Sequence, residues 1–107
     1  MGDPHQLLRL EPEELAGHLV QELKSYTQPF HPTNIAISLE HKYPNFPELY
    51  NLKESVMEAF AWLVSETLVI HDFNSVGSTF YKLSKRAKQL KTPTDINDSA
   101  SRKQNLL

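Results

Sequence analysis

The chain has 107 residues, a formal net charge of -2, 39% hydrophobic and 22% charged residues, and no cysteine. This length suits one small domain with a single core, and the charge balance excludes a global basic field that would attract nucleic acid or an anionic membrane. The lack of cysteine excludes disulfides, thiolate metal ligands and thiol nucleophiles. No apolar run approaches the roughly 20 residues that span a bilayer, so we expect a cytoplasmic protein without a membrane partner.

Three helices are predicted in the first two thirds of the chain. Residues 1–11 are predicted to be an N-terminal lead-in. Pro12 then suits a first helical position, and leucines recur every four residues from Leu15 to Leu23, which predicts a helix over 12–25. A shorter helix is predicted over 33–42, before a proline-rich turn. The strongest apolar periodicity predicts the third helix over 47–66.

A hairpin and a basic helix are predicted to follow. The short apolar segments 68–73 and 79–83 flank the turn sequence "NSVGS", which predicts a β-hairpin. Ser84 is predicted to cap a last helix over 85–91, which closes the domain that begins at residue 12. Residues 92–107 are polar and aperiodic, and they are predicted to be a linker or tail.

The order of these elements predicts the fold class. Three helices followed by a two-stranded hairpin and a short C-terminal helix indicate an α+β chain, mainly α, of the winged helix-turn-helix type. The second and third helices would form the helix-turn-helix, and the hairpin loop would be the wing. The alternative is a small α+β domain in which the same elements pack differently.

The second half of the chain, from Val56 onward, resembles a known family, and its end "LKTPTDINDSASRKQNLL" is similar to the polar stretch that leads into that family's C-terminal domain. The sequence "VMEAFAWLVSETLVIHDFNSVGSTFYKLSKRAKQLKT" is similar to the N-terminal winged-helix region of the Ymh-type abortive-infection family of bacterial defence-like proteins. The resemblance lies in Trp62-Leu63, Leu68-Val69-Ile70, Phe80-Tyr81 and Ser84-Lys85-Arg86-Ala87. It implies that this chain is the DNA-binding-like N-terminal part of a longer prokaryotic defence-type protein.

Two positions depart from the family pattern. Ala87 stands where glycine is usual, and Glu66-Thr67-Leu68 replaces a Glu-Gly-Leu turn. The loss of glycine concerns the turn from the third helix into the first strand. We expect Thr67 to adopt an ordinary β conformation there.

Nothing in the sequence indicates an enzyme, a metal or a cofactor. The five histidines are never three or four residues apart, so they lack the helical spacing of a metal site. His71 and Asp72 are neighbours in a predicted strand, where their side chains point to opposite faces. A nucleophile elbow and a glycine-rich phosphate loop are both missing. We therefore expect a binding module with no catalytic residues.

Duplex DNA, bound weakly, is the leading predicted partner. Five basic residues without an intervening acid lie between residues 82 and 91, and phosphate contacts require such side chains. Lys82 is expected to point to solvent. The third helix is acidic and contributes a single lysine, and the wing contributes only polar groups. The candidate nucleic-acid-binding residues are Lys53, Asn74, Ser75, Ser78, Lys82, Lys85, Arg86, Lys88 and Lys91.

A protein-interaction or dimerisation winged helix without DNA binding is the alternative. The net charge of the third helix opposes contact with DNA, because its acids repel phosphate. Trp62 falls on the polar side of that helix near Glu58, and it is either covered by the hairpin or offered to a partner. Trp62 and Glu58 are therefore the candidate protein interface, toward a second copy of the chain or a downstream domain.

Overall fold

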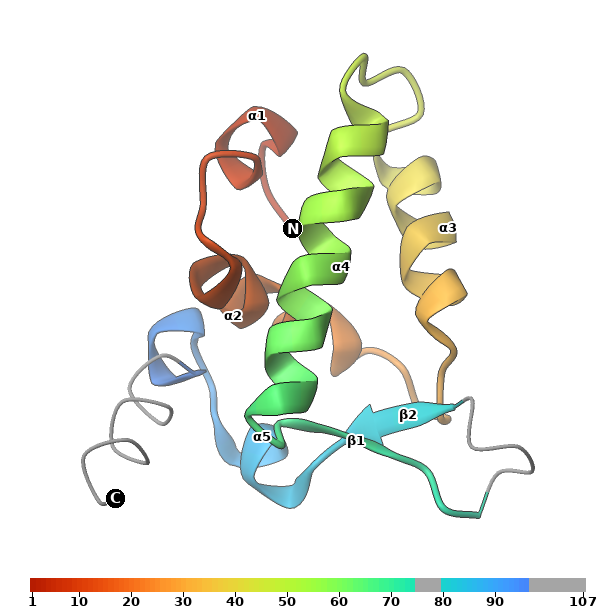
Figure 1. Cartoon of the computed structure of the whole chain (residues 1–107), viewed down its shortest axis with the longest axis vertical. Coiled ribbons are helices and arrows are strands. Elements are labelled where there is room, and N and C mark those ends of the chain that lie inside the picture. The colour runs from red at the N-terminus through yellow and green to blue at the C-terminus, as the bar shows by residue number, and fades with distance from the viewer. Residues whose placement is uncertain (75–79, 97–107) are drawn as a thin grey trace.

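The computed structural model describes residues 1–74 and 80–96. These residues form the elements α1 (Pro4–Leu7), α2 (Pro12–Leu23), α3 (Pro32–Lys42), α4 (Leu49–Ser65), β1 (Val69–His71), β2 (Tyr81–Leu83) and α5 (Lys85–Gln89). In Figure 1, α4 runs between α2 and α3, and the two strands lie at its C-terminal end. The predicted mainly helical α+β class is confirmed.

Local signals explain where the helices begin. Pro12 occupies the first turn of α2 as predicted, and Glu11 and Glu14 form a reciprocal capping box. At the start of α3, the backbone N–H of Thr33 donates to Nδ1 of His31 at 3.0 Å, and the N–H of His31 donates to Oδ1 of Asn34 at 2.9 Å. Ser84 caps α5 as predicted, because its hydroxyl accepts from the N–H of Ala87.

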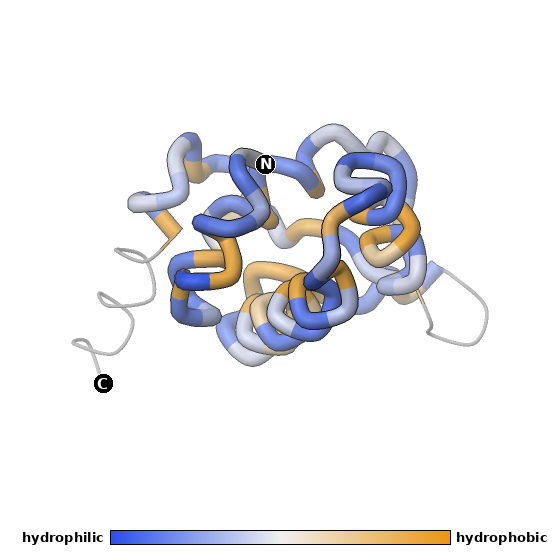
Figure 2. The backbone as a smooth tube through the Cα atoms, turned by 90° about the horizontal axis from the view of Figure 1, so that it is seen from above, coloured by the Kyte–Doolittle hydropathy of each residue, from blue (hydrophilic) through white to orange (hydrophobic). Residues whose placement is uncertain are grey.

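The core lies mainly between α2 and α4. The predicted leucine stripe of α2 is buried against the predicted stripe of α4, and α3 packs on another side of α4. Apolar and polar residues alternate around each of these helices (Figure 2), as expected when each helix buries one face. The buried residues of α2 and α4 are Leu15, Ala16, Gly17, Leu19, Val20, Leu23, Leu52, Val56, Ala59, Phe60 and Leu63.

The N-terminal lead-in is more ordered than predicted. Asp3 accepts a hydrogen bond from the N–H of His5, and Pro4 opens α1. Leu7 is only 3% exposed and belongs to the core. The physical reason is that burying Leu7 in the core stabilises a helix that is too short to form alone.

The predicted tail also begins inside the fold. Residues 93–96 are helical, and Ile96 is completely buried in the core. Pro93 packs on α2 at Gly17, so closely that a Cβ at residue 17 would lie 2.7 Å from the Pro93 carbonyl oxygen. Pro93 therefore starts a further helical segment and does not simply end the previous helix.

The sheet contains a third extended contact beside the hairpin. β1 and β2 pair antiparallel, with Val69 opposite Leu83 and His71 opposite Tyr81. On its other edge, Tyr81 exchanges two backbone hydrogen bonds with Phe30, at 2.9 and 2.7 Å. The connection between α2 and α3 thus lies beside β2, and β2 is the middle of three extended segments.

α4 ends in a turn whose backbone conformation is usually adopted by glycine. The N–H of Leu68 donates to the carbonyl of Leu63 at 2.9 Å, and the N–H of Thr67 donates to the carbonyl of Val64 at 3.1 Å. These two bonds form a Schellman motif, which needs a left-handed residue after the helix. Thr67 takes that conformation, with φ of 57°. The expectation of an ordinary β conformation at Thr67 is therefore wrong, because the motif sets its backbone.

We expect Thr67→Gly to stabilise the protein. A left-handed non-glycine residue costs about 1–2 kcal/mol, and the greater freedom of glycine in the unfolded chain removes part of that gain. The expected net increase in the free energy of unfolding is about 0.5–1 kcal/mol, measured by urea titration. Thr67→Ala is the control, and it should change little because alanine suffers similar strain. A Thr67→Gly variant less stable than Thr67→Ala would contradict the assignment.

Candidate nucleic-acid interface

α5 and the residues just after it present three exposed lysines at one end of the molecule. Ser84 fixes the start of the helix and Ala87 anchors it in the core. Lys85, Lys88 and Lys91 are all exposed. They form the accessible part of the basic cluster that the sequence analysis singled out, and we call them the α5 lysines.

Arg86 points inward. Its guanidinium Nη2 donates to the backbone carbonyl of Glu66 at 2.6 Å. That carbonyl belongs to the last turn of α4, where intrahelical donors have run out. The structure thus gives Arg86 a contact that joins α5 to the end of α4, although the sequence analysis grouped it with the surface cations.

Lys82 is less accessible than expected. Its ammonium lies 3.7 Å from Oδ1 of Asp72, a buried side chain, and 5.1 Å from the centre of the Phe73 ring. The carboxylate of Asp72 offsets part of the charge of Lys82. The face of the Phe73 ring also attracts the Lys82 ammonium. Lys82 keeps about one third of its side-chain surface exposed, so it can still contribute to a basic surface, although it does not simply project into solvent.

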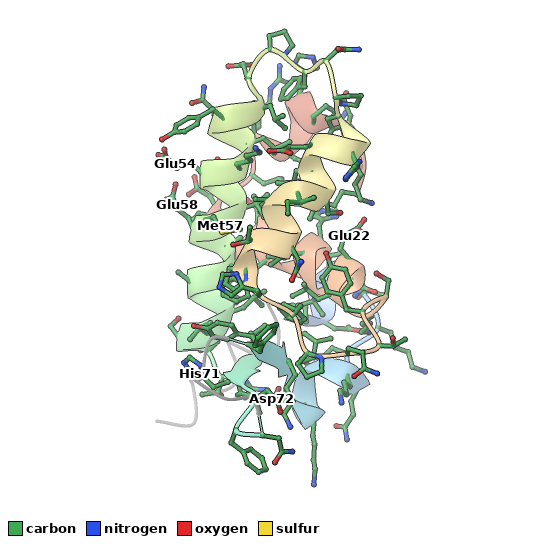
Figure 3. All side chains as sticks on the ribbon, turned by 90° about the vertical axis from the view of Figure 1, so that its right-hand side faces the viewer. Glu22, Glu54, Met57, Glu58, His71 and Asp72 are labelled. Atoms are coloured by element: carbon green, nitrogen blue, oxygen red, sulfur yellow. The ribbon has the colours of Figure 1, made fainter. Side chains whose placement is uncertain are left out.

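The outer face of α4 is acidic. Glu54 and Glu58 point away from the body of the protein (Figure 3) and are exposed. Lys53 forms an ion pair with Glu40 of α3, and this hydrogen bond lowers the pKa of the Glu40 carboxyl. The one lysine predicted on α4 is therefore directed toward α3, so it does little to offset the acids beside it.

The remaining predicted site residues are placed as follows. Asn74 is exposed near the end of the first strand. Ser75 and Ser78 lie outside the described residues. Trp62 is half-buried and packs against the core, so it offers a partner less area than a fully exposed ring. Glu58, its predicted neighbour in a protein interface, is exposed.

Sequence reasoning missed Lys24. This residue caps the C-terminus of α2, and its ammonium donates to the carbonyl of Leu90, just after α5. A hollow of about 310 Å³ is lined by Lys24 together with Lys82 and Lys88. Because Lys24 and Leu90 are far apart in sequence, no local pattern could have indicated that Lys24 joins the basic end of the molecule.

A second hollow lies on the other side of residues 26–30. It has a volume of about 660 Å³ and is lined by those residues and by the outer face of α3, including His41 and Lys42. Ile37, on its wall, is 44% exposed. The turn between α2 and α3 therefore lines both the basic hollow and a larger, more open one.

An ion-pair network joins α2, α3 and the first residue. Burial would raise the pKa of Glu22, but hydrogen bonds from Lys42 and the ammonium of Met1 outweigh it and hold the pKa of this carboxyl below its ordinary value. The same contact raises the pKa of Lys42. This network lies on α2 and α3, and none of the three lysines that line the basic hollow belongs to it.

The described residues were expected to hold neither a metal site nor a membrane-spanning helix. Across residues 1–74 and 80–96, no group of three histidine, aspartate or glutamate side chains is arranged to hold a metal ion. Within the same part of the chain, no helix combines the length and the apolar character needed to cross a bilayer.

Comparison with known proteins adds no relative. No family model, curated protein or solved structure matches this chain.

Proposed function

We propose that the chain is a winged helix-turn-helix module that binds the backbone of duplex nucleic acid, most simply DNA, through the lysines of β2 and α5. The order of the three extended segments supports this fold. In winged helices, the segment after the first helix of the bundle pairs with the second hairpin strand, as Phe30 does with Tyr81. In this proposal α3 and α4 are the helix-turn-helix and the β1–β2 connection is the wing.

The single observation that carries the binding proposal is the exposure of the α5 lysines. Lys85, Lys88 and Lys91 face solvent, and no ion pair between their side chains and a carboxylate occurs among the described residues. Cations in this state release counterions from a duplex when they meet phosphates. Phosphate contacts of this kind position a protein without reading bases.

The acids of α4 argue against base reading by that helix. Glu54 and Glu58 occupy its outer face, and carboxylates near phosphates are repelled unless they accept from a cytosine amino group. We therefore propose weak, largely sequence-independent binding. For such binding, dissociation constants of about 10⁻⁴ to 10⁻⁶ M are typical at physiological salt.

A second candidate function is protein binding. The observation that favours it is the acidic face of α4 together with the exposed Tyr50 at its start, which is 76% exposed and suits a basic partner surface. Light scattering tests whether the partner is a second copy of the chain. A protein that stays monomeric at high concentration would exclude a homodimer. The place of this module as the N-terminal part of a longer prokaryotic defence-type protein stays a proposal that rests on the family resemblance.

Fluorescence anisotropy with a short random-sequence duplex tests the binding proposal. Three contacts predict a slope of about -3 for log K against log salt, hence about a 50-fold loss of affinity between about 50 and 200 mM salt. We expect Lys85→Glu and Lys91→Glu each to weaken binding by at least about fivefold and to make the slope shallower by about 1–2.

Arg9→Glu is the charge-matched control. Arg9 is exposed and follows α1 in the sequence, and α1 lies away from α5 (Figure 1). This variant should retain affinity within about twofold, because Arg9 is not one of the lysines proposed to contact phosphate. Equal losses in Arg9→Glu and Lys85→Glu, or no binding by the wild type at low salt, would overturn the proposal.

A further inference from the structure

The basic hollow brings together lysines from three elements. Lys24 comes from the end of α2, Lys82 from β2 and Lys88 from α5, and the hollow between them has a volume of about 310 Å³. None of the described residues that line it carries a carboxylate. Three ammonium groups around one hollow repel one another, so an anion placed among them would relieve that repulsion.

Each lysine is held by a different contact. The ammonium of Lys24 donates to the Leu90 carbonyl, a neutral partner that leaves its full charge in place. Lys82 stays near Asp72 at 3.7 Å, so its side chain is oriented while part of its charge is offset. Lys88 is exposed and can close over a ligand. The site is thus partly preorganised, which lowers the entropic cost of binding.

The other walls are apolar and aromatic. Tyr26, Pro29 and Phe30 line the hollow beside the lysines, and the ring of Tyr26 is only half-buried. A volume of this size falls at the lower end of the range of small-ligand sites. Cations next to an accessible ring match a nucleotide, whose phosphate is anionic and whose base stacks on aromatic side chains.

Duplex geometry decides which nucleotide could enter. Bases inside a duplex are stacked and paired, so an internal nucleotide enters a pocket only if it is unstacked. A terminal nucleotide frays more easily, and a terminal phosphomonoester carries more charge than an internal phosphodiester. We propose that this hollow binds the phosphorylated end of a nucleic-acid strand, with Lys24, Lys82 and Lys88 around the phosphate. The proposal rests on the proposed function and makes strand ends its preferred target.

The test compares three duplexes of identical sequence, with 5′-phosphate, 3′-phosphate or only hydroxyl ends, by anisotropy competition. We expect the wild type to bind one phosphorylated form about tenfold more tightly than the hydroxyl form, as one added charge-assisted contact implies. Lys24→Gln and Lys88→Ala should each remove most of this preference. Lys24→Gln should leave affinity for the hydroxyl duplex nearly unchanged, because Lys24 is not one of the α5 lysines.

The outcomes separate the two proposals. Equal affinity of the wild type for all three duplexes overturns the strand-end site while leaving backbone binding intact. If no duplex binds, the proposed function fails. NMR titration with adenosine monophosphate, adenosine and inorganic phosphate then tests whether the hollow binds a nucleotide. Shifts of the Tyr26 resonances with the monophosphate alone support a nucleotide site. Equal effects of inorganic phosphate reduce it to a general anion site and overturn the proposal, as does the absence of any shift.

Discussion

Replacing Arg86 with alanine is expected to lower the free energy of unfolding by about 2–3 kcal/mol. The guanidinium donates to the Glu66 carbonyl at 2.6 Å in a partly buried setting, and a hydrogen bond from a charged group contributes more than a neutral one. Its loss leaves a helix-end carbonyl without this donor and detaches α5 from the end of α4. Urea unfolding followed by circular dichroism measures the effect.

Lys85→Ala is the matched control for Arg86→Ala. Lys85 is the exposed neighbour in the same helix, so its removal should change stability by less than about 0.5 kcal/mol. Arg86→Lys should recover only part of the loss, because an ammonium cannot reproduce the planar guanidinium. An Arg86→Ala variant as stable as Lys85→Ala would show that the contact with Glu66 contributes little.

Arg86 variants are therefore poor reporters of nucleic-acid binding. A loss of affinity in Arg86→Ala would combine a missing charge with a displaced α5. Substitutions at the α5 lysines avoid this ambiguity, because their side chains are exposed. The proposed experiments use them for that reason.

The second large expected effect is at Gly17. Alanine favours a helix over glycine by about 1 kcal/mol, so Gly17→Ala should stabilise an isolated α2. In the folded protein, however, the added Cβ would lie 2.7 Å from the Pro93 carbonyl oxygen and 2.8 Å from the Pro93 Cα. These are backbone atoms, so the contact is not relieved by turning a side chain. We expect a net destabilisation of about 1–3 kcal/mol.

Residues 93–96 set an upper limit on the stability that Gly17→Ala can lose. If the clash becomes too costly, residues 93–96 can leave α2, and the loss is then limited to the burial of Ile96, worth about 2–3 kcal/mol. The control is Gly17→Ala in a chain that ends at residue 91. There the substitution should be neutral or stabilising, because Pro93 is gone. Equal destabilisation in both chains would refute this explanation.

The helical part of the fold could be predicted because its signals are local. Pro12 with two following glutamates marks the start of α2, and apolar residues every three or four positions mark the buried faces of α2 and α4. The strands were predicted slightly too long. Their backbone bonds do extend to Leu68, Asp72, Phe80 and Ser84, so the pairing was placed well and only the regular part is shorter.

The segments that the sequence assigned to the ends of the chain show where local reasoning stops. The stretches 1–11 and 92–96 show no helical period and were interpreted as a lead-in and a tail, yet Leu7 and Ile96 are buried. In so short a stretch, an apolar residue has no periodic pattern around it. Its burial depends on a gap left by helices elsewhere in the chain, and that gap exists only once they have packed.

The candidate site, too, could be predicted only in part. The run of cations between residues 82 and 91 was visible as composition, and the exposure of Lys85, Lys88 and Lys91 agrees with the cap at Ser84 and the buried Ala87. The different roles of the cations were not visible. Whether a cation faces solvent or a neighbouring acid depends on which segments lie beside it, as Lys53 shows with Glu40.

By itself, the sequence determined the helices, the hairpin, the apolar faces and a basic C-terminal helix, because each depends on residues within a few positions of one another. Only the tertiary structure decided which cations remain available. Folding turns Arg86 toward the Glu66 carbonyl, sets Lys82 beside Asp72 and brings Lys24 to the edge of α5. The physical reason is that electrostatic contacts act between neighbours in space, and long-range packing alone selects those neighbours.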